Sequence, residues 1–420
     1  MINNNTCLAR VVSVGVLCFI EAFSSTPAHA AQNDWPMARH DARNTAHTEE
    51  RIDPSLHLQW RVPYCKHPST TILASGNAIC VSNTVLTGGE SSVTTLFSIS
   101  GKLLWALPDT VPVYLKGETL IVVTQKFRST EPSIICYNWK RHSATWRCTL
   151  QGEVTSFDGA VVADNLLLCS YSYADLKIGR RACLNEIDLN TGVSLASRLS
   201  SVQEWSEGSP AINGDEIYYG VGHQLLILNR DKLAQELEYE DGGNAGIMYS
   251  YAGANLITKG WEHHLQSFDT VTMSRLWIQG ASREIQHSLV MVPGRAPAVF
   301  ESSSCIDVVT GKPRWQAPVY AVDSASTANL LFVAGGAGDG VVDAGFAGLD
   351  VRTGKILWRY QHKGLEGVGI IVSEGSVIAT GSDGYLYRFS KPDRNRGATR
   401  QVGTKRKLRI LPSIGSQSTN

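Results

Sequence analysis

The chain has 420 residues, of which 43% are hydrophobic and 18% are charged, and its 38 basic residues are balanced by 38 acidic ones. This composition supports a large folded core and excludes a chain that is disordered throughout. The neutral balance gives no overall attraction for nucleic acid. No apolar run reaches the ~18–20 residues of a membrane-spanning helix. A membrane transporter, a coiled coil and a nucleic-acid packaging protein are therefore excluded.

Residues 1–30 have the pattern of a signal peptide. Arg10 precedes the apolar stretch 11–23, and Ala28-His29-Ala30 is a small-x-small cleavage sequence. Leu17 stands where a lipobox before Cys18 would need a small residue. We therefore predict cleavage before Ala31 and export of a soluble chain to the periplasm or the extracellular space.

Residues 31–390 contain an internal repeat of about 43 residues, marked by tryptophans that follow a turn. The six marker residues are Trp60, Trp105, Trp146, Trp277, Trp315 and Trp358. Leu195 and Leu237 continue the spacing across the gap between Trp146 and Trp277. Alternate residues around each marker share one face, as in a β-strand.

Each repeat has room for four short strands. The recurring Thr-Gly-Lys supplies the glycine that a tight hairpin needs for positive φ. Four strands in roughly 42 residues is the size of one β-propeller blade. No convincing stretch of helical periodicity occurs, so a helical solenoid is not favoured.

The ends of the repeat array predict how the ring closes. The first marker strand, 56–62, has no inner strands before it, and the last inner strands, within 368–389, have no outer strand after them. Pairing these two remnants removes both exposed sheet edges. We therefore predict an all-β, eight-bladed propeller of four-stranded antiparallel blades, closed by the N-terminal outer strand with the C-terminal inner strands.

The tail, residues 391–420, is strongly basic, with eight basic residues and one acidic one. Residues 31–390 hold 29 basic and 36 acidic residues and carry a net charge of −7. We expect the tail to be disordered. Two interpretations stay open, a merely solvated end and contact with an anionic surface of the envelope.

Three sequence features resemble the pyrroloquinoline-quinone-like (PQQ-like) β-propeller repeat family. They are Asp34–Asp41, the Thr-Gly-Lys-x-x-Trp repeats and Gly381–Tyr387, and the resemblance covers most of 34–390. The family includes quinoprotein alcohol dehydrogenases, which hold the quinone over calcium, and non-catalytic propellers such as the lipoprotein of the outer-membrane barrel-assembly machine. It implies that the marker tryptophans dock between neighbouring blades, with looser contacts at Leu195 and Leu237.

The dehydrogenase branch of the family fits less well. Those enzymes are longer and carry adjacent cysteines at the quinone, whereas this chain has no Cys-Cys dipeptide. No calcium ligand or catalytic aspartate can be matched residue by residue. No cofactor is therefore expected, and PQQ with calcium belongs only to the dehydrogenase alternative.

Other candidate sites have structural explanations. His263 and His264 are adjacent in an expected strand and would point to opposite faces. The glycine-rich stretch 335–345 contains Asp339 and Asp343 but lacks the regular acidic spacing of a calcium loop. No nucleophile-and-base motif is present. We therefore assign no catalytic, cofactor-binding or metal-binding residue.

The cysteines predict disulfides, which an oxidising compartment permits. In the Thr-Gly-Lys hairpins, positions ten before and two after the tryptophan are expected to face each other, as Cys136 and Cys148 would around Trp146. The predicted bridges, in order, are Cys136–Cys148, Cys169–Cys183 and Cys65–Cys80, with Cys305 unpaired. Buried reduced thiols are the alternative.

These features predict an exported, non-catalytic propeller that acts as a binding scaffold for another protein, because rigid blades allow the loops to vary. Two alternatives remain. One is a quinoprotein that oxidises an alcohol or a sugar, and the other is a module that binds polysaccharide or the envelope.

Overall fold

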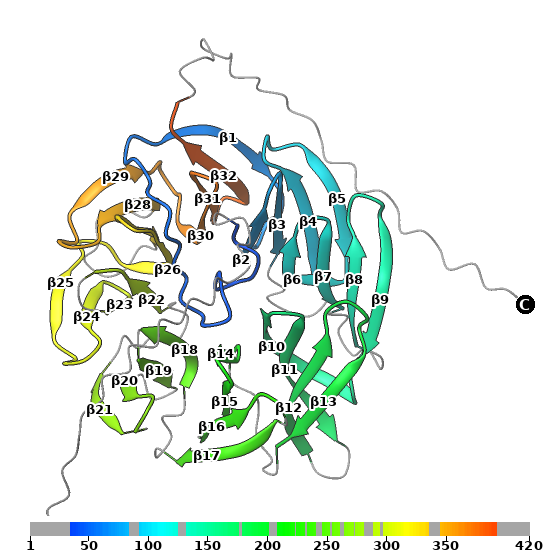
Figure 1. Cartoon of the computed structure of the whole chain (residues 1–420). Helices are drawn as coiled ribbons and strands as arrows, with labels where there is room; N and C mark the ends of the chain where they lie inside the picture. The colour runs from blue at the N-terminus through cyan, green and yellow to red at the C-terminus, as the bar shows by residue number, and fades with distance from the viewer. Residues whose placement is uncertain are drawn as a thin grey trace, which may run out of the picture.

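The computed structural model describes residues 34–392 with short gaps at 84–91, 125–131, 176–178, 201–207, 223, 232, 241–245, 253, 261–263, 273, 281–288, 295–296 and 336–344. The described chain forms eight four-stranded antiparallel sheets arranged in a ring (Figure 1). This confirms the predicted all-β, eight-bladed propeller. The predicted signal peptide and nearly all of the basic tail lie outside the described residues.

Each blade runs from an inner strand at the channel to an outer strand at the rim. Blade 1 contains β2 (Pro68–Ser75), β3 (Ala78–Asn83), β4 (Val93–Ser98) and β5 (Leu103–Pro108), and blade 2 contains β6 (Thr110–Lys116), β7 (Thr119–Thr124), β8 (Ser133–Asn138) and β9 (Ser143–Thr149). Blade 3 contains β10 (Glu153–Ala163), β11 (Leu166–Asp175), β12 (Gly179–Asp188) and β13 (Ser194–Leu199). Blade 4 contains β14 (Ala211–Asn213), β15 (Glu216–Val221), β16 (Gln224–Asn229) and β17 (Ala234–Glu240).

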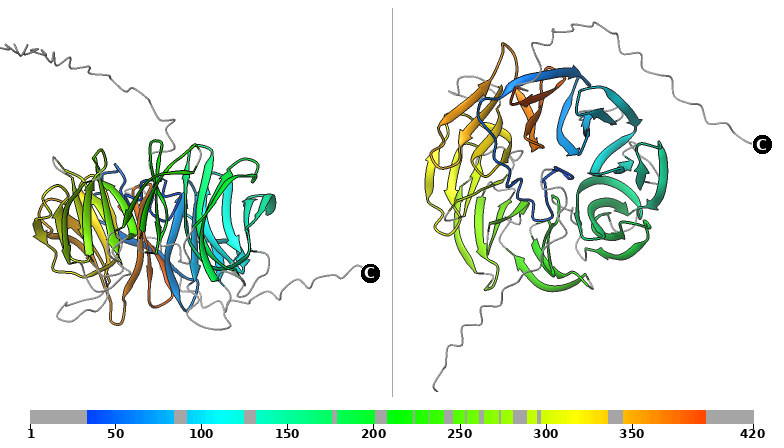
Figure 2. Two further views of the ribbon diagram at one scale, coloured as in Figure 1. Left: turned by 90° about the horizontal axis from the view of Figure 1, so that it is seen from below. Right: turned by 45° about the horizontal axis from the view of Figure 1, so that its top comes forward.

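The second half of the ring repeats this arrangement. Blade 5 contains β18 (Gly246–Ala252), β19 (Asn255–Gly260), β20 (His264–Asp269) and β21 (Arg275–Gly280). Blade 6 contains β22 (Val290–Val292), β23 (Ala298–Glu301), β24 (Ser304–Asp307) and β25 (Pro313–Gln316). Blade 7 contains β26 (Ala321–Ser326), β27 (Leu330–Gly335), β28 (Gly345–Asp350) and β29 (Ile356–Tyr360). Seen edge-on, the ring is a flat disc, and its strands run across the thickness of the disc (Figure 2).

Blade 8 joins the two ends of the chain. Its strands are β30 (Gly367–Ser373), β31 (Ser376–Gly381), β32 (Tyr385–Ser390) and, outermost, β1 (His57–Pro63). The antiparallel register of β1 and β32 runs from His57 opposite Ser390 to Pro63 opposite Tyr385. The predicted closure is therefore confirmed, and the two strands lie side by side in Figure 1.

Burial follows from the position of each strand within a blade. In the outer strand β29, Trp358 is buried while its neighbour Leu357 is 44% exposed, because alternate side chains point to opposite faces. Every residue of β27 and β31 is buried, because these strands lie between neighbouring blades. Among the described residues, no helix has the length and apolar character needed to cross a membrane.

The turn before the outer strand is held by an aspartate in several blades. In blade 6 the Asp307 carboxylate accepts hydrogen bonds from the Val309 and Thr310 N–H groups and from the Thr310 hydroxyl, at 3.1, 2.8 and 2.9 Å. The equivalent carboxylates of blades 3, 5 and 7 make the same three bonds, and they belong to Asp188, Asp269 and Asp350. The Asp-x-x-Thr pattern is thus a turn cap.

Candidate functional site: channel, blade junctions and cysteines

Residues 34–56, called the N-terminal strap below, cross the centre of the ring before the chain enters β1 (Figure 1). Backbone hydrogen bonds of 2.7–3.0 Å tie the strap to blades 1, 2, 4, 6 and 7. The bonded pairs are Trp35 with Ala74, Pro36 with Leu115, Ala42 with Ile212, Thr45 with Met291, Ala46 and Thr48 with Ser326, and Glu50 with Ala328. The strap therefore braces the ring from its centre.

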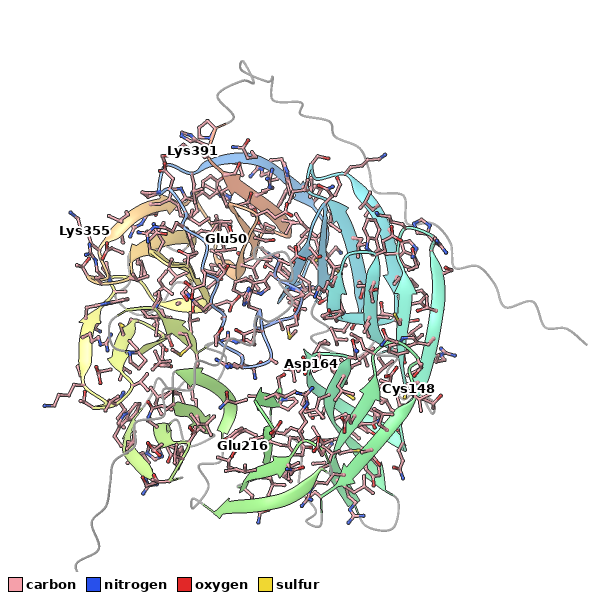
Figure 3. The ribbon with its side chains drawn as sticks, in the orientation of Figure 1. Glu50, Cys148, Asp164, Glu216, Lys355 and Lys391 are labelled. Atoms are coloured by element: carbon pink, nitrogen blue, oxygen red, sulfur yellow. The ribbon has the colours of Figure 1, made fainter. Side chains whose placement is uncertain are left out.

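Carboxylates of the strap add further ties. Asp34 accepts hydrogen bonds from the Ser75 hydroxyl and the Gly76 N–H, at 2.7 and 2.9 Å. Glu50 accepts the N–H groups of Glu374 and Gly375 in blade 8, at 3.1 and 2.7 Å. Burial raises the pKa of Glu50, although these two bonds oppose the rise. With blade 8 included, the strap reaches six of the eight blades (Figure 3 labels Glu50).

Asp41 shapes the turn in the middle of the strap. Its carboxylate accepts hydrogen bonds from the Arg43 and Thr45 N–H groups, at 3.0 and 3.1 Å, and from the Thr45 hydroxyl at 2.5 Å. Burial pushes the pKa of Asp41 upward, but hydrogen bonding to His40 and Thr45 holds it below its usual value. This carboxylate is therefore a charged structural element of the strap.

Arg39 brings a positive charge to the same region. Burial lowers the pKa of its guanidinium, while the charges of Asp323 and Asp41 raise it. Asp323 lies on the inner strand of blade 7 and accepts the Ile370 N–H of blade 8 at 2.9 Å. The acidic groups near the centre thus already bind backbone N–H groups or balance Arg39.

The marker tryptophans lie at the junctions between blades. Five of them donate the indole N–H to a carbonyl oxygen at or beside the corresponding turn of the next blade. The bonds are Trp60 to Ile99 (2.9 Å), Trp146 to Leu189 (2.9 Å), Trp277 to Val308 (2.7 Å), Trp315 to Val351 (3.1 Å) and Trp358 to Leu56 (3.1 Å). The Trp358 bond spans the ring closure, because Leu56 directly precedes β1.

The turn glycine of the next blade packs against the indole. Gly354 has φ +69°, and a Cβ atom there would lie 2.4 Å from the ring of Trp315. The same close approach occurs for Gly101 on Trp60, Gly192 on Trp146 and Gly311 on Trp277. Glycine and tryptophan therefore recur together because each fills the space that the other leaves.

The Trp105 junction uses different chemistry. The position of the turn glycine is taken by His142, whose φ is +53°. Its imidazole stacks on the indole of Trp105, with ring centroids 4.9 Å apart and planes 13° from parallel. Stacking of His142 thus takes the place of the glycine contact at this junction.

The register corrects one marker position. In blade 3, Ala196 of the outer strand lies opposite Glu186, just as Trp358 lies opposite Gly348 in blade 7. Ala196, not Leu195, therefore occupies the tryptophan position of blade 3. Leu195 points outward and is 54% exposed. A different contact joins this blade to the next, since Arg198 donates to the Leu233 carbonyl at 3.0 Å. Leu237 faces Ile227 in β17, at the predicted position.

The predicted disulfides are absent, since Cys65, Cys80, Cys136, Cys148, Cys169, Cys183 and Cys305 are all free. The proposed hairpin register was wrong because the turn lies earlier in the chain than expected. Asn138 pairs with Ser143 across the turn, so that Cys136 faces Trp146 and Cys148 faces Ile134.

The other two predicted bridges are displaced in a similar way. Cys169 faces Asn185, and Cys183 faces Tyr171, so these two cysteines are offset by two residues. Cys80 faces Leu73 and Leu96 inside blade 1, whereas Cys65 lies before β2. Burial raises the pKa of the Cys183 thiol to about 11 and that of Cys305 to about 12. These thiols are therefore protonated and poorly nucleophilic at neutral pH.

A polar cluster at the ring closure gave no signal in the sequence. The Tyr387 hydroxyl donates to Asp383, and His362 Nε2 lies 3.1 Å from that hydroxyl and 3.6 Å from the Asp383 carboxylate. Burial raises the pKa of Tyr387, and the neighbouring Asp383 carboxylate raises it further. Tyr387 is fully buried between blades 7 and 8, so the cluster secures the closure rather than presenting a nucleophile.

Residues 262–406 match a family model described as outer membrane protein assembly factor BamB. No curated protein sequence matches the chain. Together with the solved structures below, the family match confirms the resemblance to PQQ-like propeller proteins. The chain has their fold.

Several solved structures share this fold. The europium-containing methanol dehydrogenase is 13% identical, with a TM-score of 0.62 over 86% of this chain and 98% of that one. BamB from Moraxella catarrhalis is 13% identical, with a TM-score of 0.54 over 80% and 100%. The quinohemoprotein alcohol dehydrogenase from Comamonas testosteroni is 12% identical, with a TM-score of 0.60 over 89% and 83%. At these identities the likeness concerns the fold alone.

Calcium takes six to eight oxygen ligands, but no group of three or more His, Cys, Asp or Glu side chains in the described part of the chain is arranged to hold a metal ion. Asp339, Asp343 and His263 lie outside the described residues, and His264 is half-buried in β20.

Proposed function

We propose that this chain is a non-catalytic propeller scaffold that binds another protein in the cell envelope and needs no cofactor. The observation that carries the proposal is the strap, which braces six blades from the centre and uses Asp34, Asp41 and Glu50 in structural hydrogen bonds. The family description as an outer membrane assembly factor supports it. The signal-peptide pattern of residues 1–30 supports an exported location.

Exposed apolar residues on two neighbouring turns give this scaffold a surface for a partner. Val271 in blade 5 is 84% exposed and Val309 in blade 6 is 53% exposed. Each lies two residues after the capping aspartate and donates its N–H to that carboxylate, so the backbone that carries the side chain is held in place. Exposed apolar groups on such ordered turns are suited to burial against another protein.

Site-specific photocrosslinking in cells tests this proposal. A photoreactive phenylalanine derivative is placed at Val271 or at Val309, and at Arg352 as the matched control, since Arg352 holds the same turn position in blade 7. We expect one discrete adduct with an envelope protein from positions 271 and 309 and none from 352. Absence of an adduct at both valines, or an identical adduct from all three positions, contradicts the proposal.

A second measurement separates the scaffold from a dehydrogenase. The purified chain is titrated with PQQ in the presence of calcium and assayed for dye-linked alcohol oxidation. We expect neither stoichiometric binding nor turnover. Tight binding with turnover would make the chain a quinoprotein and overturn the non-catalytic proposal.

A further inference from the structure

A cavity of about 300 Å³ lies between blades 2 and 3, on the side where turns join the first and second strands of each blade. Its lining residues are Tyr114, Lys116, Thr119, Cys136, Thr145, Trp146, Leu189 and Asn190. This volume is at the lower end of the range for ligand sites and suits a ligand of the size of one sugar ring. None of these residues belongs to the strap or to the crosslinking positions.

The walls of the cavity are rigid. The Trp146 indole N–H is bound to the Leu189 carbonyl at 2.9 Å, and Gly192 packs against its ring. Burial raises the pKa of Tyr114 to about 12, so its hydroxyl keeps its proton and can donate. Burial also raises the pKa of the Cys136 thiol, which is therefore a neutral part of the wall. Two aromatic rings and a neutral thiol supply the apolar part of the lining.

The remaining lining residues are polar. Thr119 and Thr145 contribute hydroxyls, Asn190 contributes an amide and the exposed Lys116 contributes an ammonium group. The Thr145 hydroxyl donates to the Cys136 carbonyl at 3.2 Å, which leaves its oxygen able to accept a further bond. Aromatic rings together with hydroxyl and amide groups suit a sugar, which has an apolar C–H face and a polar edge.

Lys116 is the charged side chain among the lining residues, and it favours a negative charge on the ligand. In blade 2 the turn cap is Asn138, which accepts the Arg141 N–H at 2.9 Å, so the turn keeps its cap without a carboxylate. Lys140 and the exposed Arg141 lie in this turn, and Glu118 pairs with Lys140 at 2.9 Å. The Asp188 carboxylate lies in the same turn as Leu189 and Asn190 and accepts the Asn190 N–H. The positive charge available to a ligand in the cavity is therefore that of Lys116.

We propose that this cavity binds a carboxylated monosaccharide unit of the uronic acid class. The sugar ring packs against Trp146, its hydroxyls bond to Thr119, Thr145 and Asn190, and its carboxylate pairs with Lys116. This inference is independent of the protein-scaffold proposal, because it uses different residues and a different ligand.

Isothermal titration of the full chain with glucuronate, glucose and acetate tests this site. We expect saturable glucuronate binding at least tenfold tighter than glucose binding and no competition by acetate. Lys116→Gln should abolish the preference for glucuronate over glucose. Lys355→Gln is the matched control, a lysine substitution on the opposite side of the ring (Figure 3), and should leave binding unchanged. Thermal melting of both variants checks that they fold.

Several outcomes would overturn the proposal. They are no saturable binding of glucuronate, an unchanged preference in Lys116→Gln, or equal competition by acetate, which would indicate a simple anion site. Competition by polygalacturonate distinguishes the source of the sugar. If polygalacturonate displaces glucuronate at the same concentration of uronate units, the ligand is a unit within a polymer. If it does not, the ligand is the free sugar.

Discussion

The junction between blades 6 and 7 and the junction between blades 3 and 4 solve one packing problem with different residues. In the first, Trp315 bonds to Val351 and packs on Gly354. In the second, Ala196 takes the tryptophan position and Arg198 reaches the Leu233 carbonyl. A junction therefore needs a donor that reaches the next turn and a surface that fits it, and tryptophan with glycine is one of several ways to supply both.

The ring closure is the junction whose loss should have the largest effect. Deleting β1, residues 57–63, leaves the edge of β32 unpaired and removes the strand that completes blade 8. We expect no cooperative unfolding transition in this variant, measured by circular dichroism during heating. Removal of residues 393–420 serves as the control and should leave the melting curve unchanged. A β1 deletion that melts like the full chain would refute closure by the two ends.

Substitutions at a regular and at an irregular junction should differ strongly. Trp358 is buried and packs edge-on against Phe332 and Phe389, so Trp358→Ala should cost about 3–5 kcal/mol of unfolding free energy. Leu195 points to solvent, so Leu195→Ala should change that free energy by less than about 0.5 kcal/mol. Denaturant titration measures both. A similar loss in the two variants would restore Leu195 as the docking residue of blade 3.

Acid should affect the turns capped by aspartate more than the turn of blade 2, and this effect is the smallest of the three. Burial acts to raise the pKa of Asp307, but hydrogen bonds from Arg314 and Thr310 outweigh it and bring the pKa to about 2. Because the folded-state pKa lies below the unfolded value of about 3.9, the stabilisation is present above about pH 4 and is lost as the pH falls towards 2. The amide of Asn138 does not titrate in this range, so the turn of blade 2 should not show this loss.

The measurement is the melting temperature between pH 5 and pH 2.5. Asp307→Asn should reduce the fall in melting temperature over this interval, as the natural Asn138 cap of blade 2 suggests. The Asn variant should also keep the turn, because an amide oxygen can accept the same N–H groups. An unchanged pH dependence would show that this carboxylate does not contribute to acid sensitivity.

The number of blades and their closure could be predicted because tryptophans mark the outer strands at nearly constant spacing. Trp358 and the turn before it carry both a period and a strand pattern, which are local properties of the sequence. The predicted docking position of blade 3, Leu195, was wrong by one residue. The small side chain of Ala196 gives no sign in the sequence that its position is the one that faces the next blade. The position of the turn before Ser143 was also misjudged, since the register depends on how two strands pair.

The candidate sites depend on contacts between distant segments. Asp34–Asp41 was recognised as part of a family pattern, but nothing in these residues shows that they lie at the centre of the ring. The cavity unites Tyr114 with Asn190 from a neighbouring blade, and only the docking of Trp146 brings them together. Such sites follow from tertiary packing, which leaves no short-range period in the sequence.

The pairing of β1 with β32 has a consequence for biogenesis. His57 is among the first structured residues that the ribosome makes, whereas its partner Ser390 follows more than three hundred residues later. Blades 1 to 7 are contiguous in sequence and can assemble locally, but β1 must wait as an unpaired strand until translation is almost complete. Such long-range pairing slows folding and exposes a strand edge to aggregation. The first strand of the ring is therefore the last one to find its partner.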